Sequence, residues 1–372
     1  MVSGQIFKIH SDFHYVNLEN EVYECKVREV LKKQKTKVLV GDFVQCAEVN
    51  LMRKTAVIEK VLPRKNFLTR PSVANVEQVV IVSSIKEPDL DFVQLNRYIS
   101  LAKHHGIKTR LCFNKNDLSL DDSIIEKVFQ IYEPLGFEII FTSALEKLGI
   151  EDFVQLLKGK TTVFCGNSGV GKSSLINAIA PDLHIRTKEV SEKTSRGVHT
   201  TRHCEIITIV NGKQERGKRS ASPSSPPEGE DRGGGLSSGK KQHSKPIRII
   251  DTPGFSNLKF DFLLPTQVDE LFDEIKKYKS KCKFADCLHI DEADCEVLNH
   301  IDEIDESRYQ SYLSFVNEAK EYKERIRTES LKIETSQKEG LNRQVAKIST
   351  RKRQSARNTI KQNIYKDLEE TE

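Results

Sequence analysis

The sequence predicts a multidomain fold with an N-terminal β-barrel, a central α/β domain and a C-terminal helical domain. Short segments that alternate apolar and polar residues occupy the first 65 positions, as barrel strands do. From about residue 75, apolar strands alternate with helical segments, which is the pattern of a parallel sheet wrapped by helices. After residue 263, helical segments flank a cluster of cysteines with one histidine.

The barrel is expected over residues 1–65. Turn residues separate its five candidate strands, which are QIFKI, HYVNL, VYECKVR, KVLVGDFVQCAEV and TAVIEKVL. Five short strands at this spacing predict a small barrel of the OB or SH3 type. A basic connector with Arg64, Lys65 and Arg70 follows it.

The central domain is expected over residues 72–262. Its candidate strands are VEQVVIVSSI, KTRLCFN, EIIFTSA, TTVFC and PIRII. The helical segments between them are DLDFVQLNRYISLAKHHG, DDSIIEKVFQIYEPLG, LEKLGIEDFVQLLKG and KSSLINAIA. Residues 211–246 interrupt this pattern with Ser, Gly, Pro and charged residues. Because they offer almost nothing to bury, we expect a disordered insert there.

The stretch GNSGVGKSS, residues 166–174, fits the phosphate-binding pattern G-x-x-x-x-G-K-S. It follows a predicted strand and opens a predicted helix, the context that this motif requires. Backbone N–H groups and the helix N-terminus attract phosphate oxygens. Lys172 is expected to reach the β- and γ-phosphates, and Ser173 to bind Mg²⁺. The expected nucleotide-binding residues are Gly166, Asn167, Ser168, Gly169, Val170, Gly171, Lys172, Ser173 and Ser174.

The stretch NKND, residues 114–117, fits the guanine-binding pattern N-K-x-D. The Asp117 carboxylate only accepts hydrogen bonds, so it suits the N1–H and N2–H of guanine, which adenine does not offer. The stem of Lys115 is expected to lie along the base. In FTSA, a backbone N–H is expected to meet the guanine O6. The residues expected around the base are Asn114, Lys115, Asp117, Ser143 and Ala144.

The stretch DTPG, residues 251–254, follows a strand. Asp251 is expected to hold Mg²⁺ through water and the Gly254 N–H to meet the γ-phosphate. The motifs occur in an unusual order, because the phosphate loop normally opens a GTPase domain and here follows the guanine motif. Ligands bind at the carboxyl ends of parallel strands in either order, and nearby termini make permutation tolerable. We interpret this domain as a circularly permuted P-loop GTPase domain.

Cys282, Cys287, His289 and Cys295 form the pattern C-x4-C-x-H-x5-C. In a cytosolic protein such a cluster indicates metal before disulfide. Three thiolates and one imidazole complete a tetrahedral structural zinc site with no open position for catalysis. We therefore expect a zinc-binding helical domain over residues 263–335, with helices at 266–278 and 303–333. Tyr309, Tyr312, Leu313, Val316 and Ala319 share one face of the second helix.

Together, the permuted order, the barrel and the Cys3His cluster resemble the RsgA (YjeQ) family of small ribosomal subunit biogenesis GTPases. The resemblance covers roughly residues 1–335, and TSRGVHTTR at 194–202 stands where that family has switch I. It implies an OB-fold barrel and slow intrinsic GTP hydrolysis, stimulated by the small (30S) ribosomal subunit. It also implies a role in late 30S maturation.

The resemblance also implies roles for residues of switch I. Thr201 resembles the Mg²⁺ ligand, with Thr200 as the alternative. His199 resembles a histidine linked to hydrolysis. The alternative is that His199 is a solvated loop residue without a catalytic role. Phe255 follows DTPG, where other GTPases often place a water-orienting Gln. The expected catalytic residues are His199, Thr201 and Lys172, and the expected magnesium ligands are Ser173, Thr201 and Asp251.

Charge and hydropathy indicate the partners and the compartment. The net charge is +5, and residues 341–363 hold seven Lys or Arg and no acidic residue. This tail, within 336–372, is expected to be a solvated, partly disordered end or an electrostatic arm for nucleic acid. The barrel, the connector around Arg64 and Arg70, and the tail are expected to offer surfaces for rRNA phosphates.

No apolar run approaches the roughly 18 residues of a membrane span, and the N-terminus lacks the shape of a secretory signal. We therefore expect a cytoplasmic monomer whose partners are the small subunit with its rRNA, and GTP or GDP. Two alternatives are an RNA-binding module with a vestigial nucleotide site and an ATP-using P-loop enzyme. Intact Lys172, Ser173, Asp251 and Asp117 argue against the first, and NKND argues against the second.

Overall fold

The structure is a computed structural model that divides into two compact units, Met1–Leu258 and Lys259–Glu372. The described residues are 1–33, 36–68, 71–119, 122–183, 204–210, 212–214, 245–251, 260 and 262–342, with the side chains of 32, 214, 251 and 329–342 excepted. Several predicted features lie outside them, namely residues 194–202, Gly254, Phe255, Arg70, most of the insert and the tail beyond Asn342. Among the described helices, none is long and apolar enough to cross a membrane.

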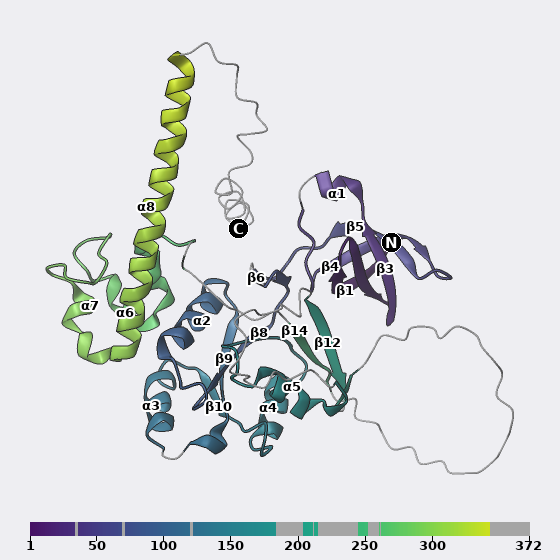
Figure 1. Ribbon diagram of the computed structural model, residues 1–372, viewed down its shortest axis with the longest axis horizontal. Helices are drawn as coiled ribbons and strands as arrows, with labels where there is room; N and C mark the ends of the chain where they lie inside the picture. Colours follow the sequence, from purple (N-terminus) through teal and green to yellow (C-terminus); the bar gives the residue numbers. More distant parts are fainter. Residues whose placement is uncertain are drawn as a thin grey trace, which may run out of the picture. The chain divides into compact units, whose positions relative to one another are not determined.

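The first unit begins with a closed five-stranded barrel, seen in purple in Figure 1. Its strands are β1 (Val2–His10), β2 (Phe13–Leu18), β3 (Glu21–Val27), β4 (Phe43–Asn50) and β5 (Thr55–Val61). They pair in the order β1-β2-β3-β5-β4, and β4 returns to pair with β1. Only β3 and β5 run parallel. The predicted barrel is confirmed, and its closed five-stranded order agrees with the OB type.

The barrel core comes from the alternating apolar positions of the strands. Ile6, Val16, Val44 and Ile58 are fully buried inside it. A short helix, α1 (Glu29–Lys33), follows β3 and was not predicted. The regular alternation of the sequence is therefore sufficient to predict this barrel, because each strand has one face toward the core.

The connector after the barrel is structural at Arg64. Its guanidinium forms a bidentate ion pair with the fully buried Asp42, at 2.6 Å and 2.8 Å. Asp42 also accepts the Leu39 N–H. The Arg64 guanidinium therefore neutralises a buried carboxylate, a structural role that was not predicted from the sequence. Two short strands follow, β6 (Phe67–Leu68) and β7 (Val73–Ala74).

The central sheet has the strand order β10-β9-β8-β11-β14-β12. Its strands are β8 (Gln78–Ser84), β9 (Lys108–Asn114), β10 (Glu138–Phe141), β11 (Thr161–Cys165), β12 (Glu205–Val210) and β14 (Ile247–Asp251). The five strands from β10 to β14 are parallel, as predicted. The chain runs outward from β8 to β10 and then restarts at β11 on the other side of β8. Such a switch point is where open α/β sheets bind ligands.

Helices surround this sheet in the predicted alternation. They are α2 (Phe92–His104), α3 (Ser123–Tyr132), α4 (Ile150–Leu157) and α5 (Lys172–Ile179), with the 3-10 turns η1 (Asn116–Leu118) and η2 (Pro181–Leu183). The Asp91 side chain caps α2 by accepting the Gln94 N–H. The helices and strands share a core that includes Val80, Phe153, Leu175 and Ile249.

Strand β12 was not predicted from the sequence. It runs antiparallel to β14, unlike the five parallel strands. Within the segment predicted as a disordered insert, β13 (Lys213–Gln214) pairs with Ile209 and Val210. Regular structure therefore extends to Gln214, past the predicted start of the insert.

The second unit is helical. It contains η3 (Pro265–Leu271), α6 (Asp273–Lys279), α7 (Glu296–Asn299), η4 (Ile301–Glu303) and α8 (Glu306–Asn342). The single helix predicted at 266–278 is wrong, because Phe272 is extended and divides it. This break lets the buried Phe272 ring pack against Tyr312 and Phe315 of α8. The predicted face of α8 is confirmed: Tyr312, Val316 and Ala319 are fully buried, and Tyr309 and Leu313 pack beside them.

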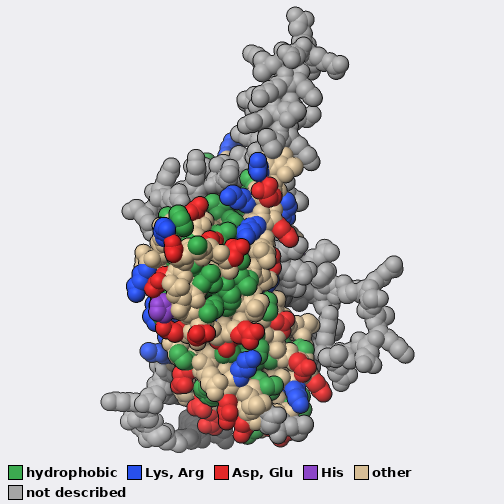
Figure 2. Space-filling model, turned by 90° about the vertical axis from the view of Figure 1, so that its left-hand side faces the viewer, with side chains coloured by type: hydrophobic (Ala, Val, Ile, Leu, Met, Phe, Trp, Pro, Cys, Tyr) green, Lys and Arg blue, Asp and Glu red, His purple; other side chains and the backbone are tan. Residues whose placement is uncertain are grey.

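The described surface shown in Figure 2 mixes both signs of charge around a group of hydrophobic side chains. Lys, Arg, Asp and Glu side chains are interspersed over this face. A broad patch of one sign is therefore not visible on the described part of this face.

Candidate nucleotide and metal sites

The phosphate loop joins β11 to α5 at the switch point of the sheet. Gly166 has a φ of 143°, and a Cβ there would lie 2.0 Å from the Val82 carbonyl oxygen of β8. Gly171 has a φ of 94°, and a Cβ there would lie 2.2 Å from Asn114 Nδ2. Both glycines of the motif are thus required by backbone angle and by space.

Asn114 of the guanine motif holds three segments together. Its Nδ2 donates to the Val170 carbonyl of the phosphate loop at 3.0 Å. Its Oδ1 accepts the Ala144 N–H at 3.1 Å and the Thr142 hydroxyl at 3.2 Å. The side chain is 1% exposed, so these bonds are shielded from water and fix the relative positions of the guanine motif, the base-pocket segment and the phosphate loop.

The other predicted base residues lie on the segments that Asn114 joins. Lys115 adopts a left-handed conformation and donates its ammonium to the Glu87 carbonyl. Asp117 is exposed in η1, which is tied to the base-pocket segment by a bond from the Asn116 N–H to the Thr142 carbonyl, 3.1 Å long. The positions of these segments follow from strand ends β9 and β10, which are neighbours in the sheet.

Ser143 and Ala144 of the base-pocket segment both make hydrogen bonds within the protein. Ser143 is fully buried, and its hydroxyl oxygen accepts the Glu146 N–H at 3.0 Å. It therefore shapes a turn. The Ala144 N–H donates to Asn114 Oδ1, which ties the base-pocket segment to the guanine motif.

Lys172 lies inside the phosphate loop. Its ammonium donates to the Gly166 carbonyl at 2.9 Å and the Asn167 carbonyl at 2.6 Å. Burial lowers the pKa of Lys172 from its ordinary value. Ser173 and Ser174 follow in the first turn of α5 and are half-buried. This geometry places one ammonium and a helix N-terminus at a single loop, which suits a phosphate chain.

Asp251 is the last residue of β14. Because β14 pairs in parallel with β11 up to Ile250, its end lies at the sheet edge where the phosphate loop begins. The predicted catalytic residue His199, the predicted magnesium ligand Thr201 with its alternative Thr200, and Gly254 lie outside the described residues.

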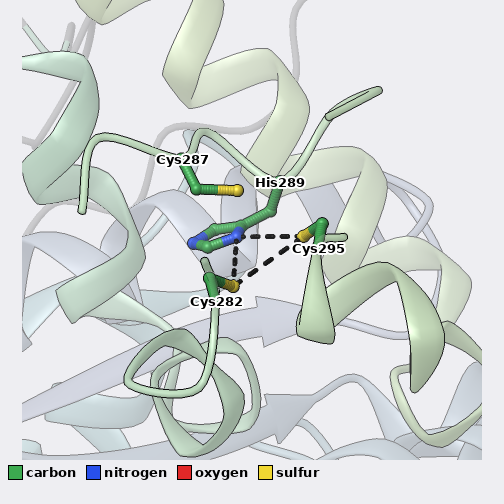
Figure 3. Close-up of side chains that lie close together, drawn as sticks. All are labelled: Cys282, Cys287, His289 and Cys295. Atoms are coloured by element: carbon green, nitrogen blue, oxygen red, sulfur yellow. Dashed lines mark hydrogen bonds between the residues drawn. The ribbon is translucent and has the colours of Figure 1, made fainter. Parts of the chain in front are cut away.

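The Cys3His cluster of the second unit is assembled as its spacing predicts (Figure 3). The ligand atoms of Cys282, Cys287, His289 and Cys295 all lie within 4.8 Å of one another. His289 Nδ1 is 3.6 Å from Cys282 Sγ and 3.4 Å from Cys295 Sγ, and the two sulfurs are 4.0 Å apart. Burial raises the pKa of the Cys287 thiol to about 12.

These separations fit a tetrahedral zinc ion. Zinc–sulfur bonds of about 2.3 Å and a zinc–nitrogen bond of about 2.0 Å place sulfurs about 3.8 Å apart and sulfur and nitrogen about 3.5 Å apart. The three separations in the structure agree with these values within a few tenths of an ångström. The donor set is closed, so a bound ion would have a structural role.

Residues distant in sequence orient this cluster. His289 Nε2 faces the buried Asp269 carboxylate at 3.6 Å, as ring nitrogens of metal-binding histidines commonly face carboxylates. From α8, Tyr309 donates to the His289 carbonyl at 2.7 Å and Tyr312 to the Leu288 carbonyl at 2.8 Å. The Glu292 carboxylate accepts the N–H groups of Leu288, Ile290 and Asp291.

Sequence comparison connects this architecture with a known family. The family model described as RsgA N-terminal domain matches residues 3–55, and the one described as RsgA GTPase matches residues 61–214. A third, described as 50S ribosome-binding GTPase, matches residues 161–348. A similar curated protein is the small ribosomal subunit biogenesis GTPase RsgA of Alkaliphilus metalliredigens. It is 37% identical over 322 residues, covering 86% of this chain and 98% of the relative. The chain belongs to the RsgA family.

Further similarities extend over the same part of the chain. The RsgA protein of Geobacillus sp. (strain WCH70) is 37% identical over 87% of this chain and 100% of its own length. The crystal structure of YjeQ from Thermotoga maritima matches with a TM-score of 0.66 and 32% identity, covering 86% of this chain and 98% of the other. YloQ, described as a circularly permuted GTPase, matches with a TM-score of 0.63 and 30% identity, covering 86% and 96%.

Membership in the RsgA family confirms the predicted fold class, including the permuted GTPase domain, and identifies the chain as a GTP hydrolase. Three residues that support the sites were not predicted from the sequence. Asp269 and Glu292 contact the Cys3His cluster, and Tyr98 contacts the phosphate loop. No motif marks them, because each acts through a contact that depends on the folded chain.

Proposed function

We propose that this GTP hydrolase binds the small (30S) ribosomal subunit, acts in its late maturation, and hydrolyses GTP to GDP and phosphate faster when the subunit is bound. The observation that carries the proposal is the name of the relatives, small ribosomal subunit biogenesis GTPase, in proteins that this chain matches over 98% and 100% of their length. A matched length of this kind means that every domain of those proteins has a counterpart here.

The proposed GTP site consists of the phosphate loop and the guanine motif together. Asp117 and Lys115 contact the base, while Lys172 and the loop N–H groups contact the phosphates. The remaining members of the proposed site are Asn114, Ser143, Ala144, Gly166, Asn167, Ser168, Gly169, Val170, Gly171, Ser173, Ser174, Asp251 and Gly254. A GTPase of this type uses Mg²⁺ with GTP, and Ser173, Thr201 and Asp251 would hold the ion.

We also propose one structural zinc ion per chain, held by Cys282, Cys287, His289 and Cys295. The fit of their separations to a tetrahedron supports this assignment. Bound zinc would keep the thiols as thiolates, despite the burial that raises their pKa. All four ligands lie between α6 and α7, so the metal would close this connection on itself and stabilise the second unit.

The proposed organisation is a cytoplasmic monomer with a barrel at 1–65, a GTPase domain at 72–262, a zinc-binding domain at 263–335 and a basic tail at 336–372. The barrel and the tail are the proposed rRNA-binding parts. Binding through phosphates would weaken steeply as salt rises.

Co-sedimentation with purified ribosomal subunits tests the proposed partner. The full chain with a non-hydrolysable GTP analogue should pellet with small subunits and dissociate when GDP replaces the analogue. Large subunits are the matched control, because one family model carries the description 50S ribosome-binding GTPase. Preferential pelleting with large subunits would contradict the small-subunit proposal and favour that alternative.

Switch I supplies a separate prediction. No Gln follows DTPG, so we propose that His199 positions the attacking water when the ribosomal subunit orders its loop. His199→Ala should retain GTP affinity within about 2-fold and lose roughly 10- to 1,000-fold of the subunit-stimulated rate. Equilibrium binding and single-turnover hydrolysis of the same preparation measure both quantities. An unchanged stimulated rate would remove His199 from the mechanism.

A further inference from the structure

The phosphate loop is anchored from outside at both of its halves. Asn114, at the end of β9, holds the second half by binding the Val170 carbonyl. In the first half, the hydroxyl of Tyr98 on α2 donates to Asn167 Oδ1 at 3.0 Å. The motif pattern explains the first anchor, but it says nothing of the second.

Tyr98 is built into the core of its helix. The side chain is 3% exposed, and a buried phenol hydroxyl requires a hydrogen-bond partner. Burial raises the pKa of Tyr98 to about 12, so the hydroxyl keeps its proton at neutral pH and remains a donor. The orientation of the Asn167 side chain is therefore set by a rigid group on a neighbouring helix.

The Asn167 carbonyl is also one of the two hydrogen-bond acceptors of the Lys172 ammonium. Lys172 Nζ lies 2.6 Å from the Asn167 carbonyl oxygen and 2.9 Å from that of Gly166. Because the side chain and the carbonyl of Asn167 belong to one short loop residue, holding the first restricts the second. Tyr98 thus contacts the loop at the residue that fixes where the ammonium lies.

We propose that Tyr98 is a positioning residue of the phosphate loop, which acts through Asn167 to place Lys172 for the γ-phosphate. The inference rests on the proposed nucleotide site and is independent of the ribosomal partner. Since Lys172 serves both the β- and the γ-phosphate, and GDP lacks the γ-phosphate, misplacing its ammonium should affect GTP more than GDP. The ratio of the two affinities is therefore the diagnostic quantity.

The test measures equilibrium binding of a non-hydrolysable GTP analogue and of GDP to the full chain, with Mg²⁺ and without ribosomes. Tyr98→Phe should weaken binding of the analogue roughly 3- to 10-fold, the loss of one buried hydrogen bond, and that of GDP less than about 2-fold. Asn167→Ala should shift the ratio in the same direction. The double variant should lose no more than the larger single effect, because both changes remove one interaction.

Tyr132→Phe is the matched control. Tyr132 on α3 is fully buried and donates to Oδ1 of Asn96, which lies on α2 as Tyr98 does, at 2.8 Å. This variant therefore removes an equivalent hydrogen bond to α2 without changing a contact of the phosphate loop. An equal change of the affinity ratio in Tyr132→Phe would show a general effect of helix stability and overturn the proposal. An unchanged ratio in folded Tyr98→Phe would overturn it too. Wild-type protein that binds neither nucleotide would instead refute the nucleotide site itself.

Discussion

Replacement of Asp117 by Asn should convert the protein from a guanine-binding to a xanthine-binding GTPase. A carboxylate accepts hydrogen bonds from N1–H and N2–H of guanine, whereas an amide presents an NH₂ donor that matches the carbonyl at C2 of xanthine. The position of Asp117 in η1, tied to the base-pocket segment by the Asn116 N–H, is consistent with this contact.

The expected effect is large because two charge-assisted bonds are lost and one donor opposes another. Each such bond contributes roughly 1.5–3 kcal/mol, so GTP affinity should fall about 100- to 10,000-fold, with a corresponding gain for xanthosine triphosphate. Titration of both nucleotides measures the exchange. Asp152→Asn on the exposed side of α4 is the control and should change neither. GTP binding as tight as in the wild type would refute the assignment of this motif.

Replacement of Cys287 by Ser should remove zinc and unfold much of the second unit. Structural zinc contributes about 10–16 kcal/mol to small zinc domains at neutral pH, more than the whole stability of many domains. Here the cysteines belong to the hydrophobic core of the second unit. Cys287 and Cys295 pack in the same cluster as Phe272, Tyr312 and Phe315. Loss of the metal should therefore reach α8 through the tyrosines that bind the backbone at Leu288 and His289.

Metal analysis and thermal unfolding measure the outcome together. Wild-type protein purified without chelator should hold one zinc per chain. Cys287→Ser should hold none, and the unfolding of its second unit should shift down by more than about 10 °C. GTP binding by the first unit should persist. Cys204→Ser, which lies outside the cluster, is the control for loss of a thiol. Retention of wild-type stability by a metal-free Cys287→Ser variant would refute the structural role.

Local pattern predicted the features that have local causes. The alternation of apolar residues predicted the barrel, and continuous apolar runs predicted β8, β9 and β11, because burial on one face or both determines these patterns. Motif spacing predicted the convergence of Cys282, Cys287, His289 and Cys295, since they lie within one short segment. The existence of the phosphate loop required only its own residues and the strand and helix beside it.

Features with distant causes were missed. The orientation of β12 depends on its pairing with β14, which lies beyond the insert. The break at Phe272 depends on the ring packing of α8. The ion pair of Arg64 was not predicted, because its partner Asp42 is 22 positions away and fully buried. In each case, a contact distant in sequence outweighs the local preference.

Activation of this RsgA-family GTPase by the small ribosomal subunit is tested most directly by steady-state GTP turnover. The full chain should be assayed alone, with purified small subunits and with purified large subunits, at equal concentrations and low salt. Turnover should be slow alone, rise by at least about 10-fold with small subunits, and remain near the basal rate with large ones. Equal stimulation by both subunits, or none by the small subunit, would contradict the account.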